Sequence, residues 1–99
     1  FGLSRERNLS QPKAYGIGEA YPNPFNPTTQ MTLDLNTDAN VSVKVFNMNG
    51  QLVDVIANGQ MSSGSYSFTW DGTNASSGVY FIQTEVGSEI NSQKIMLVK

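Results

Sequence analysis

Apolar and polar residues alternate with a period of two along most of this 99-residue chain. Such alternation places one set of side chains on each face of a strand, and it indicates half-buried β-structure. The pattern is clearest in Met31–Leu35, Val41–Val45 and Tyr66–Trp70. No stretch has the period of an amphipathic helix. We therefore expect an all-β domain.

Four further segments complete the predicted strands. A weak strand is expected at Tyr15–Glu19, and the last one at Ile90–Val98. Leu52–Ala57 and Val79–Val86 carry apolar residues on both faces, which predicts positions in the middle of a sheet. The regular spacing of about seven strands is typical of an immunoglobulin-like antiparallel β-sandwich. Its core would consist of Val, Leu, Ile and Phe residues together with Trp70.

The segment Asn47-Met48-Asn49-Gly50 is a hairpin signal with two interpretations. Asn49-Gly50 can form a two-residue type I′ turn, or Asn47 can start a type I turn that Gly50 closes in a left-handed conformation. We favour the second interpretation, because an Asn at the first position of a turn can hydrogen-bond back to the backbone.

A second loop signal is Trp70-Asp71-Gly72-Thr73-Asn74. Asp71 and Asn74 offer side-chain oxygens that calcium could use, but calcium usually takes about six to eight oxygen ligands. We therefore expect no metal site here. The favoured interpretation is an Asx-turn in which Asp71 caps the loop backbone.

Three of the four prolines fall within the segment Tyr21-Pro22-Asn23-Pro24-Phe25-Asn26-Pro27, here called the proline motif. Proline fixes φ and lacks a backbone donor, and it pushes the preceding residue towards extended conformations. The motif is therefore expected to be a stiff, extended lead-in, with Phe25 plugging one end of the sandwich. We divide the chain into a linker or tail of an upstream region at residues 1–20 and a domain at residues 21–99.

The composition excludes several kinds of function. The chain has no cysteine and no histidine, which removes disulfides, thiolate ligands and the commonest general base. Its acidic residues stand in no catalytic motif, so we expect neither an enzyme nor a cofactor. Residues 14–93 hold one lysine against seven carboxylates, a balance unsuited to nucleic acid. No apolar run approaches the roughly 20 residues of a membrane-spanning helix, so we expect no membrane insertion.

Five motifs in order carry a resemblance to a known family. They are Tyr21–Thr29, Val45–Val53, Trp70–Asn74, Ser77–Phe81 and Lys94–Lys99. The series resembles the type A C-terminal sorting domain of the type IX secretion system over about residues 20–99. The middle motifs are also similar to the immunoglobulin-like domain of flagellar hook-capping proteins. The proline motif and the lysine-terminated ending favour the sorting domain.

The resemblance implies a secretion signal. Such a domain directs a cargo protein, joined upstream in the same chain, across the outer membrane to the cell surface or the exterior. The secretion machinery of the outer membrane recognises it, and a sortase removes it at a point that would lie between Lys13 and Tyr21. We expect a monomer. The family's recognition residues fall on Gly78, Val79, Tyr80, Lys94, Ile95, Met96, Leu97, Val98 and Lys99.

Two physical hypotheses accompany the resemblance. The terminal strand could add to an exposed sheet edge of a partner, with Ile95 and Leu97 facing one way and Met96 and Val98 the other. The stiff proline motif could hold the upstream chain extended for the processing enzyme, away from the folded body.

The alternative function is an immunoglobulin-like spacer or a carbohydrate-binding module of a secreted multidomain enzyme. A sugar-binding platform would need exposed aromatic residues, but several of the candidates stand at positions that we expect to be buried in the core. The candidates are Tyr21, Phe25, Tyr66, Trp70 and Tyr80.

Overall fold

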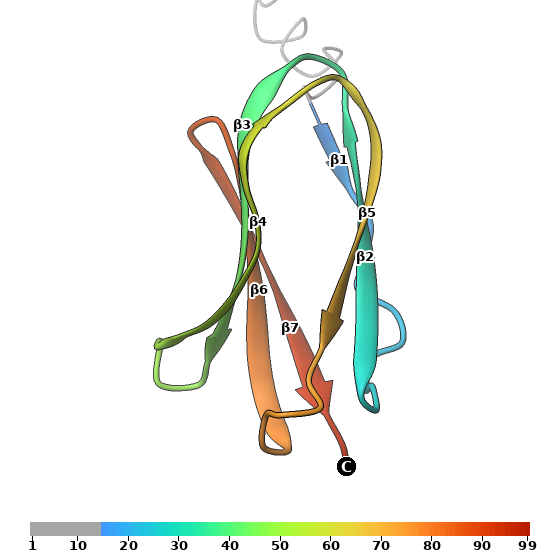
Figure 1. Cartoon of the computed structure of the whole chain (residues 1–99), viewed down its shortest axis with the longest axis vertical. Coiled ribbons are helices and arrows are strands. Elements are labelled where there is room, and N and C mark those ends of the chain that lie inside the picture. Colours follow the sequence, from blue (N-terminus) through green and yellow to red (C-terminus); the bar gives the residue numbers. More distant parts are fainter. Residues whose placement is uncertain (1–14) are drawn as a thin grey trace, which may run out of the picture.

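The structure, a computed structural model, describes residues 15–99 and consists of two antiparallel sheets that face each other (Figure 1). The smaller sheet has the strand order β1-β2-β5, and the larger sheet has the order β4-β3-β6-β7. This is the immunoglobulin-like sandwich expected from the alternation. The strands are β1 (Tyr15–Ile17), β2 (Thr28–Leu35), β3 (Ala39–Asn47), β4 (Leu52–Met61), β5 (Gly64–Asp71), β6 (Gly78–Val86) and β7 (Glu89–Leu97).

The core lies between the sheets and is built mainly from alternate side chains of β2, β3, β6 and β7, while β1 and β4 contribute partly buried residues at its margin. In β2 every second residue is buried and its neighbours are exposed, whereas in β3 and β6 the buried residues alternate with half-buried ones. Leu33, Val43 and Ile95 have no exposed surface at all. Burial of each such apolar side chain stabilises the fold by about 1.5–3 kcal/mol. The central position predicted for Val79–Val86 is confirmed, because β6 pairs with strands on both sides.

The central position predicted for Leu52–Ala57 is wrong, because β4 forms the edge of the larger sheet. The pairing of β4 with β3 shifts register at two points, and such bulges turn side chains of an edge strand outward. Leu52, Val53 and Val55 are accordingly exposed. Asp54 accepts a hydrogen bond from Trp70 Nε1 at 3.0 Å and so ties β4 to β5 in the other sheet.

The predicted core needs a second correction among its phenylalanines. Phe25 is buried and Phe68 packs against the core margin. Phe46 and Phe81 occupy the half-buried positions that alternate with the buried residues of β3 and β6, so they lie on the outer face of the larger sheet. They pair directly with each other across these strands.

The turn between β3 and β4 follows the favoured interpretation. Gly50 N donates to Asn47 O at 3.0 Å, and Gly50 has a φ of +82°, in the left-handed region that glycine adopts without strain. Asn47 Oδ1 accepts hydrogen bonds from the backbone nitrogens of Asn49 and Gln51. The type I turn started by Asn47 is therefore confirmed.

The two ends of the sandwich differ. At one end β4 passes into β5 through Ser62 and Ser63, so that the chain crosses from one sheet to the other (Figure 1). The opposite end holds the C-terminus and the loop between β5 and β6. The sequence motifs that resemble a sorting domain gather at this second end.

Candidate recognition site at the terminal strand

The proline motif folds into a compact loop against the sandwich, so the expected extended lead-in is wrong. Tyr21 and Gln30 exchange two backbone hydrogen bonds, of 2.8 and 3.1 Å. Thr29 Oγ1 donates to Pro22 O at 2.8 Å inside the loop. These contacts with the start of β2, together with the docking of Phe25, outweigh the local preference of the prolines for extended chain.

The same loop runs beside the terminal strand β7. Phe25 N donates to Met96 O and Val98 N donates to Phe25 O, each at 2.9 Å, and Phe25 forms a parallel bridge with Leu97. Phe25 thereby adds a single residue to the larger sheet, on the edge of β7 that β6 leaves open.

Asn23 continues this pairing with its side chain. Its Nδ2 donates to Lys94 O at 2.9 Å, and its Oδ1 accepts from Met96 N at 3.0 Å. A carboxamide has one carbonyl and an N–H donor, as a peptide group has, so it can replace a strand residue in a ladder. The Asn23 carboxamide replaces a strand residue in this way, and it links the proline motif to β7.

Gln93 completes the contact with residues before the proline motif. Its Nε2 donates to Gly18 O at 3.0 Å, and its Oε1 accepts from Ala20 N at 2.7 Å. The edge of β7 is therefore hydrogen-bonded from Lys94 to Val98 and contacted at Gln93. This overturns the expectation that the terminal strand could add to a partner's sheet through this edge.

The aromatic residues at this end close the sandwich. Phe25 is only 2% exposed, and its ring centroid lies 5.7 Å from that of Trp70 at an interplanar angle of 58°. Trp70 in turn lies 5.2 Å from Tyr80 at 59°. Tilted pairs of this kind are favourable beyond their buried area. Phe25 thus plugs one end of the sandwich as expected, and these three buried residues cannot belong to an exposed sugar platform.

The loop between β5 and β6 packs against both segments. Gly72 N donates to Pro27 O at 2.8 Å. A Cβ at this position would lie 3.0 Å from Leu97 Cδ2 and 3.4 Å from Phe25 Cε2. Only glycine allows such a close approach of backbone to its neighbours without displacing them.

Asp71 caps this loop, as predicted. Its Oδ1 accepts hydrogen bonds from Thr73 N, at 2.9 Å, and from the Thr73 hydroxyl. These two hydrogen bonds, and to a smaller extent the charge of Lys99, hold the pKa of Asp71 below its ordinary value. The described residues contain no group of three or more metal-binding side chains.

Lys99 is attached to the same loop. Its backbone nitrogen donates to Ser77 Oγ at 3.1 Å, and its Nζ donates to Thr73 O at 2.6 Å. In the strand that precedes it, Ile95 and Leu97 are buried, whereas Met96 and Val98 are 42% and 47% exposed. The two faces expected for the terminal strand are confirmed.

The predicted recognition residues on β6 and β7 lie side by side. Gly78, Val79 and Tyr80 pair in antiparallel register with Leu97, Met96 and Ile95.

Three residues whose hydrogen bonds attach the terminal strand or Lys99 to neighbouring segments were not predicted from the sequence, namely Gln93, Thr73 and Ser77. Gln93 had a signal, because it is a polar residue in the position that precedes Ile95 and Leu97 on the inward face of the strand.

The fold defines an immunoglobulin-like domain, and solved structures share it. One is dimeric latent PorU from Porphyromonas gingivalis, which is 19% identical with a TM-score of 0.66 over 88% of this chain and 10% of that chain. Another is PorZ, an essential bacterial surface component of the type IX secretion system of the same organism. It is 22% identical with a TM-score of 0.57 over 85% of this chain and 12% of that chain. The chain thus spans about a tenth of the length of each, and at these identities only the fold is shared.

The family itself is shown by the sequence. The chain belongs to the secretion system C-terminal sorting domains, whose family model matches residues 19–99. Domains of this family are sorting signals of the type IX secretion system, for export to the cell surface or the extracellular space, and are not themselves catalytic. No curated protein matches the chain. No helix among residues 15–99 is long and apolar enough to span a membrane.

Proposed function

We propose that this domain carries a cargo protein, joined upstream in the same chain, across the outer membrane. The outer-membrane secretion machinery recognises the domain, and a cell-surface sortase then processes it. The observation that supports this most directly is the convergence of the family's motifs on one site. The proline motif, the Asp71–Ser77 loop and the terminal strand are hydrogen-bonded to one another at one end of the sandwich.

The recognised atoms, in this proposal, are side chains rather than a free strand edge. Ile95 and Leu97 anchor the terminal strand in the core, and Met96, Val98 and Lys99 face solvent. Because Asn23 and Phe25 occupy the backbone groups along this edge, a partner that leaves the domain folded reads the exposed side chains.

The processing point, in this proposal, lies before Tyr15. Tyr15 pairs with Leu35 in the smaller sheet, Gly18 N donates to Thr32 O at 3.0 Å, and Ala20 is buried. A protease needs locally opened chain, and opening this segment would break the sheet. The region expected to contain the processing point, Lys13 to Tyr21, is therefore narrowed to the residues before Tyr15. The proline motif therefore does not hold the preceding residues away from the folded domain, because the chain is already part of that domain from Tyr15 onward.

A reporter fused to the N-terminus of the 99-residue chain tests the proposal in a bacterium with a type IX secretion system. We expect the reporter on the cell surface, and inside the cell in a strain whose outer-membrane translocon is inactive. Deletion of residues 94–99 should also abolish export, but it removes Ile95 and Leu97 from the core. The translocon mutant is therefore the cleaner control. Equal display in both strains would refute the proposal and favour the spacer function.

A further inference from the structure

The outer face of the larger sheet carries an exposed surface on which residues of three of the sorting motifs meet Lys44, which belongs to none of them. We call it the apolar–basic patch, and it consists of Phe46, Leu52, Phe81, Met96, Lys44 and Lys94. Leu52 is 53% exposed and Met96 is 42% exposed. A shallow hollow of about 350 Å³ lies over Phe46 and Phe81.

The pairing register assembles the patch from all four strands. Leu52, Phe46, Phe81 and Lys94 are consecutive partners across β4, β3, β6 and β7. The next row places Lys44 between Val55 and Gln83. Met96 lies on the same face of β7 as Lys94, two residues further along the strand.

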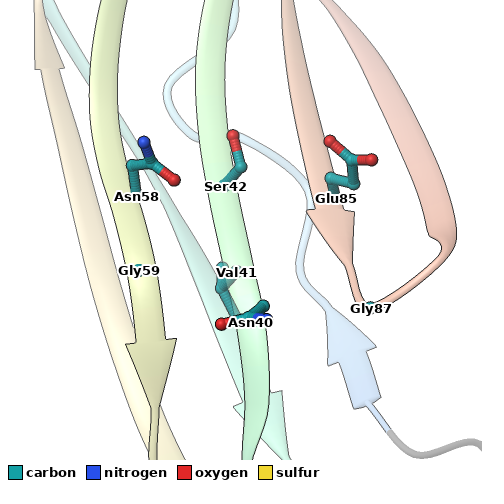
Figure 2. Close-up of a pocket in the computed structure, with 7 residues that line it drawn as sticks. All are labelled: Asn40, Val41, Ser42, Asn58, Gly59, Glu85 and Gly87. Atoms are coloured by element: carbon teal, nitrogen blue, oxygen red, sulfur yellow. The ribbon is translucent and has the colours of Figure 1, made fainter.

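The charge of the patch is opposite to that of the domain. Over residues 14–93 one lysine stands against seven carboxylates. Within the patch, however, Lys44 and Lys94 have only neutral cross-strand partners. Two carboxylates lie near these lysines: Glu85, one row beyond Lys44 in the register, and Glu19, which lines a pocket together with Lys94. Figure 2 shows Glu85 beside Ser42 and Asn58, around a shallow polar pocket.

A contiguous exposed apolar surface flanked by one sign of charge is the form of an interaction site. Its complement is an apolar centre with carboxylates at the rim, because opposite charges around a desolvated core set orientation and specificity. We propose that the apolar–basic patch docks such an acidic-rimmed protein surface in the secretion machinery. The patch shares Lys94 and Met96 with the terminal residues and extends their contact across β6, β3 and β4. This inference rests on the proposed function.

The test uses the reporter fusion with substitutions in the patch. Lys44→Glu with Lys94→Glu should lower export about tenfold or more, because like charges across an interface cost several kcal/mol. Lys44→Arg with Lys94→Arg should keep it. Leu52→Ser with Met96→Ser, at two exposed positions, should also lower export. Glu85→Lys is the matched control on the same face and should leave export unchanged. Thermal unfolding of each purified chain must show that the fold is intact.

Each outcome of these experiments supports or overturns docking of the apolar–basic patch to the secretion machinery. Unchanged export of folded Lys→Glu and Ser variants would overturn the patch while leaving the proposed function, and failure of the unaltered chain to export would refute the function first. Lysine-dependent co-sedimentation with phosphatidylglycerol vesicles would assign the patch to lipid instead. A dimer in sedimentation velocity that Met96→Ser dissolves would assign it to a second copy of the chain. Either result overturns the proposal.

Discussion

Asn23 joins two segments that lie more than 70 residues apart in the chain. Its carboxamide contacts Lys94 O over a separation of 71 residues and Met96 N over a separation of 73. Hydrogen bonds of this kind each contribute about 0.5–1.5 kcal/mol net. A single exposed side chain therefore takes the place of a strand beside the terminal strand β7.

Replacing Asn23 by alanine should lower the free energy of unfolding by about 1–2 kcal/mol, since two hydrogen bonds to the backbone of β7 are lost. Urea unfolding measures the change. Asn26→Ala is the control, because Asn26 belongs to the same motif and is exposed. Its effect should stay within about 0.5 kcal/mol. Equal losses in the two variants would contradict the role of Asn23.

Asp71 makes stability depend on acid pH. Its pKa is lowered in the folded state, so its ionised form stabilises the fold above its ordinary pKa of 3.8. This contribution is lost as pH falls through the lowered value. The Tm of the unaltered chain should therefore fall more steeply below about pH 4 than that of Asp71→Asn. Circular dichroism melts between pH 6 and pH 2 check this. Thr73→Val should give an intermediate curve, and parallel curves for all three chains would refute the cap.

At the scale of elements, the two edges of the larger sheet are treated differently. On β7 the edge is covered by residues 18–25, whereas β4 is interrupted by bulges and leaves Leu52 and Val53 exposed. Both devices limit unwanted strand pairing. The cover on β7 further holds the terminal strand in one register, because Phe25 and Asn23 both bond to its backbone.

Gly72→Ala tests how closely these elements approach. The added Cβ would meet Leu97 Cδ2 at 3.0 Å, and Phe25 Cε2 and Pro27 O at 3.4 Å. Overpacking of this kind costs about 1–3 kcal/mol, so we expect that loss in urea unfolding. Gly16→Ala is the control, because nothing lies within 4 Å of a Cβ there. A loss in the control as large as that in Gly72→Ala would show that the close approach does not matter.

At the scale of the whole molecule, the start of β1 and the C-terminus lie at opposite ends of the sandwich (Figure 1). In the proposed function, a cargo joined upstream would be connected to the domain through the end away from the candidate recognition site.

The position of β1 limits where the processed domain can begin. In the proposed function, the domain that a sortase releases should start at or before Tyr15, because β1 begins at that residue. N-terminal sequencing of the released fragment measures this. A fragment that starts after Tyr15 would contradict the prediction, since it would have lost part of β1 from the packed structure.

Local patterns predicted the strands, the Asn47 turn and the Asp71 cap, because each depends on residues within a few positions of one another. The position of β4 was mispredicted for a physical reason. Apolar residues on both faces arise equally from a central strand and from a bulged edge strand, and only the pairing with β3 separates the two. Phe46 and Phe81 were expected in the core but lie on the outer face. Alternation separates the two side-chain sets of a strand, but it does not say which set faces inward.

By itself, the sequence determined the all-β class, the positions of the strands along the chain and the family, since alternation and motif order are properties of the chain. Only the tertiary structure decided that the proline motif covers the edge of the terminal strand. Prolines predict a stiff segment but carry no information on what that segment contacts. The contacts of Asn23, Phe25 and Gln93 form only when segments about 70 residues apart are brought together by the sandwich. The edge of β7 is closed from Lys94 to Val98, whereas Met96 and Val98 stay exposed on its outer face.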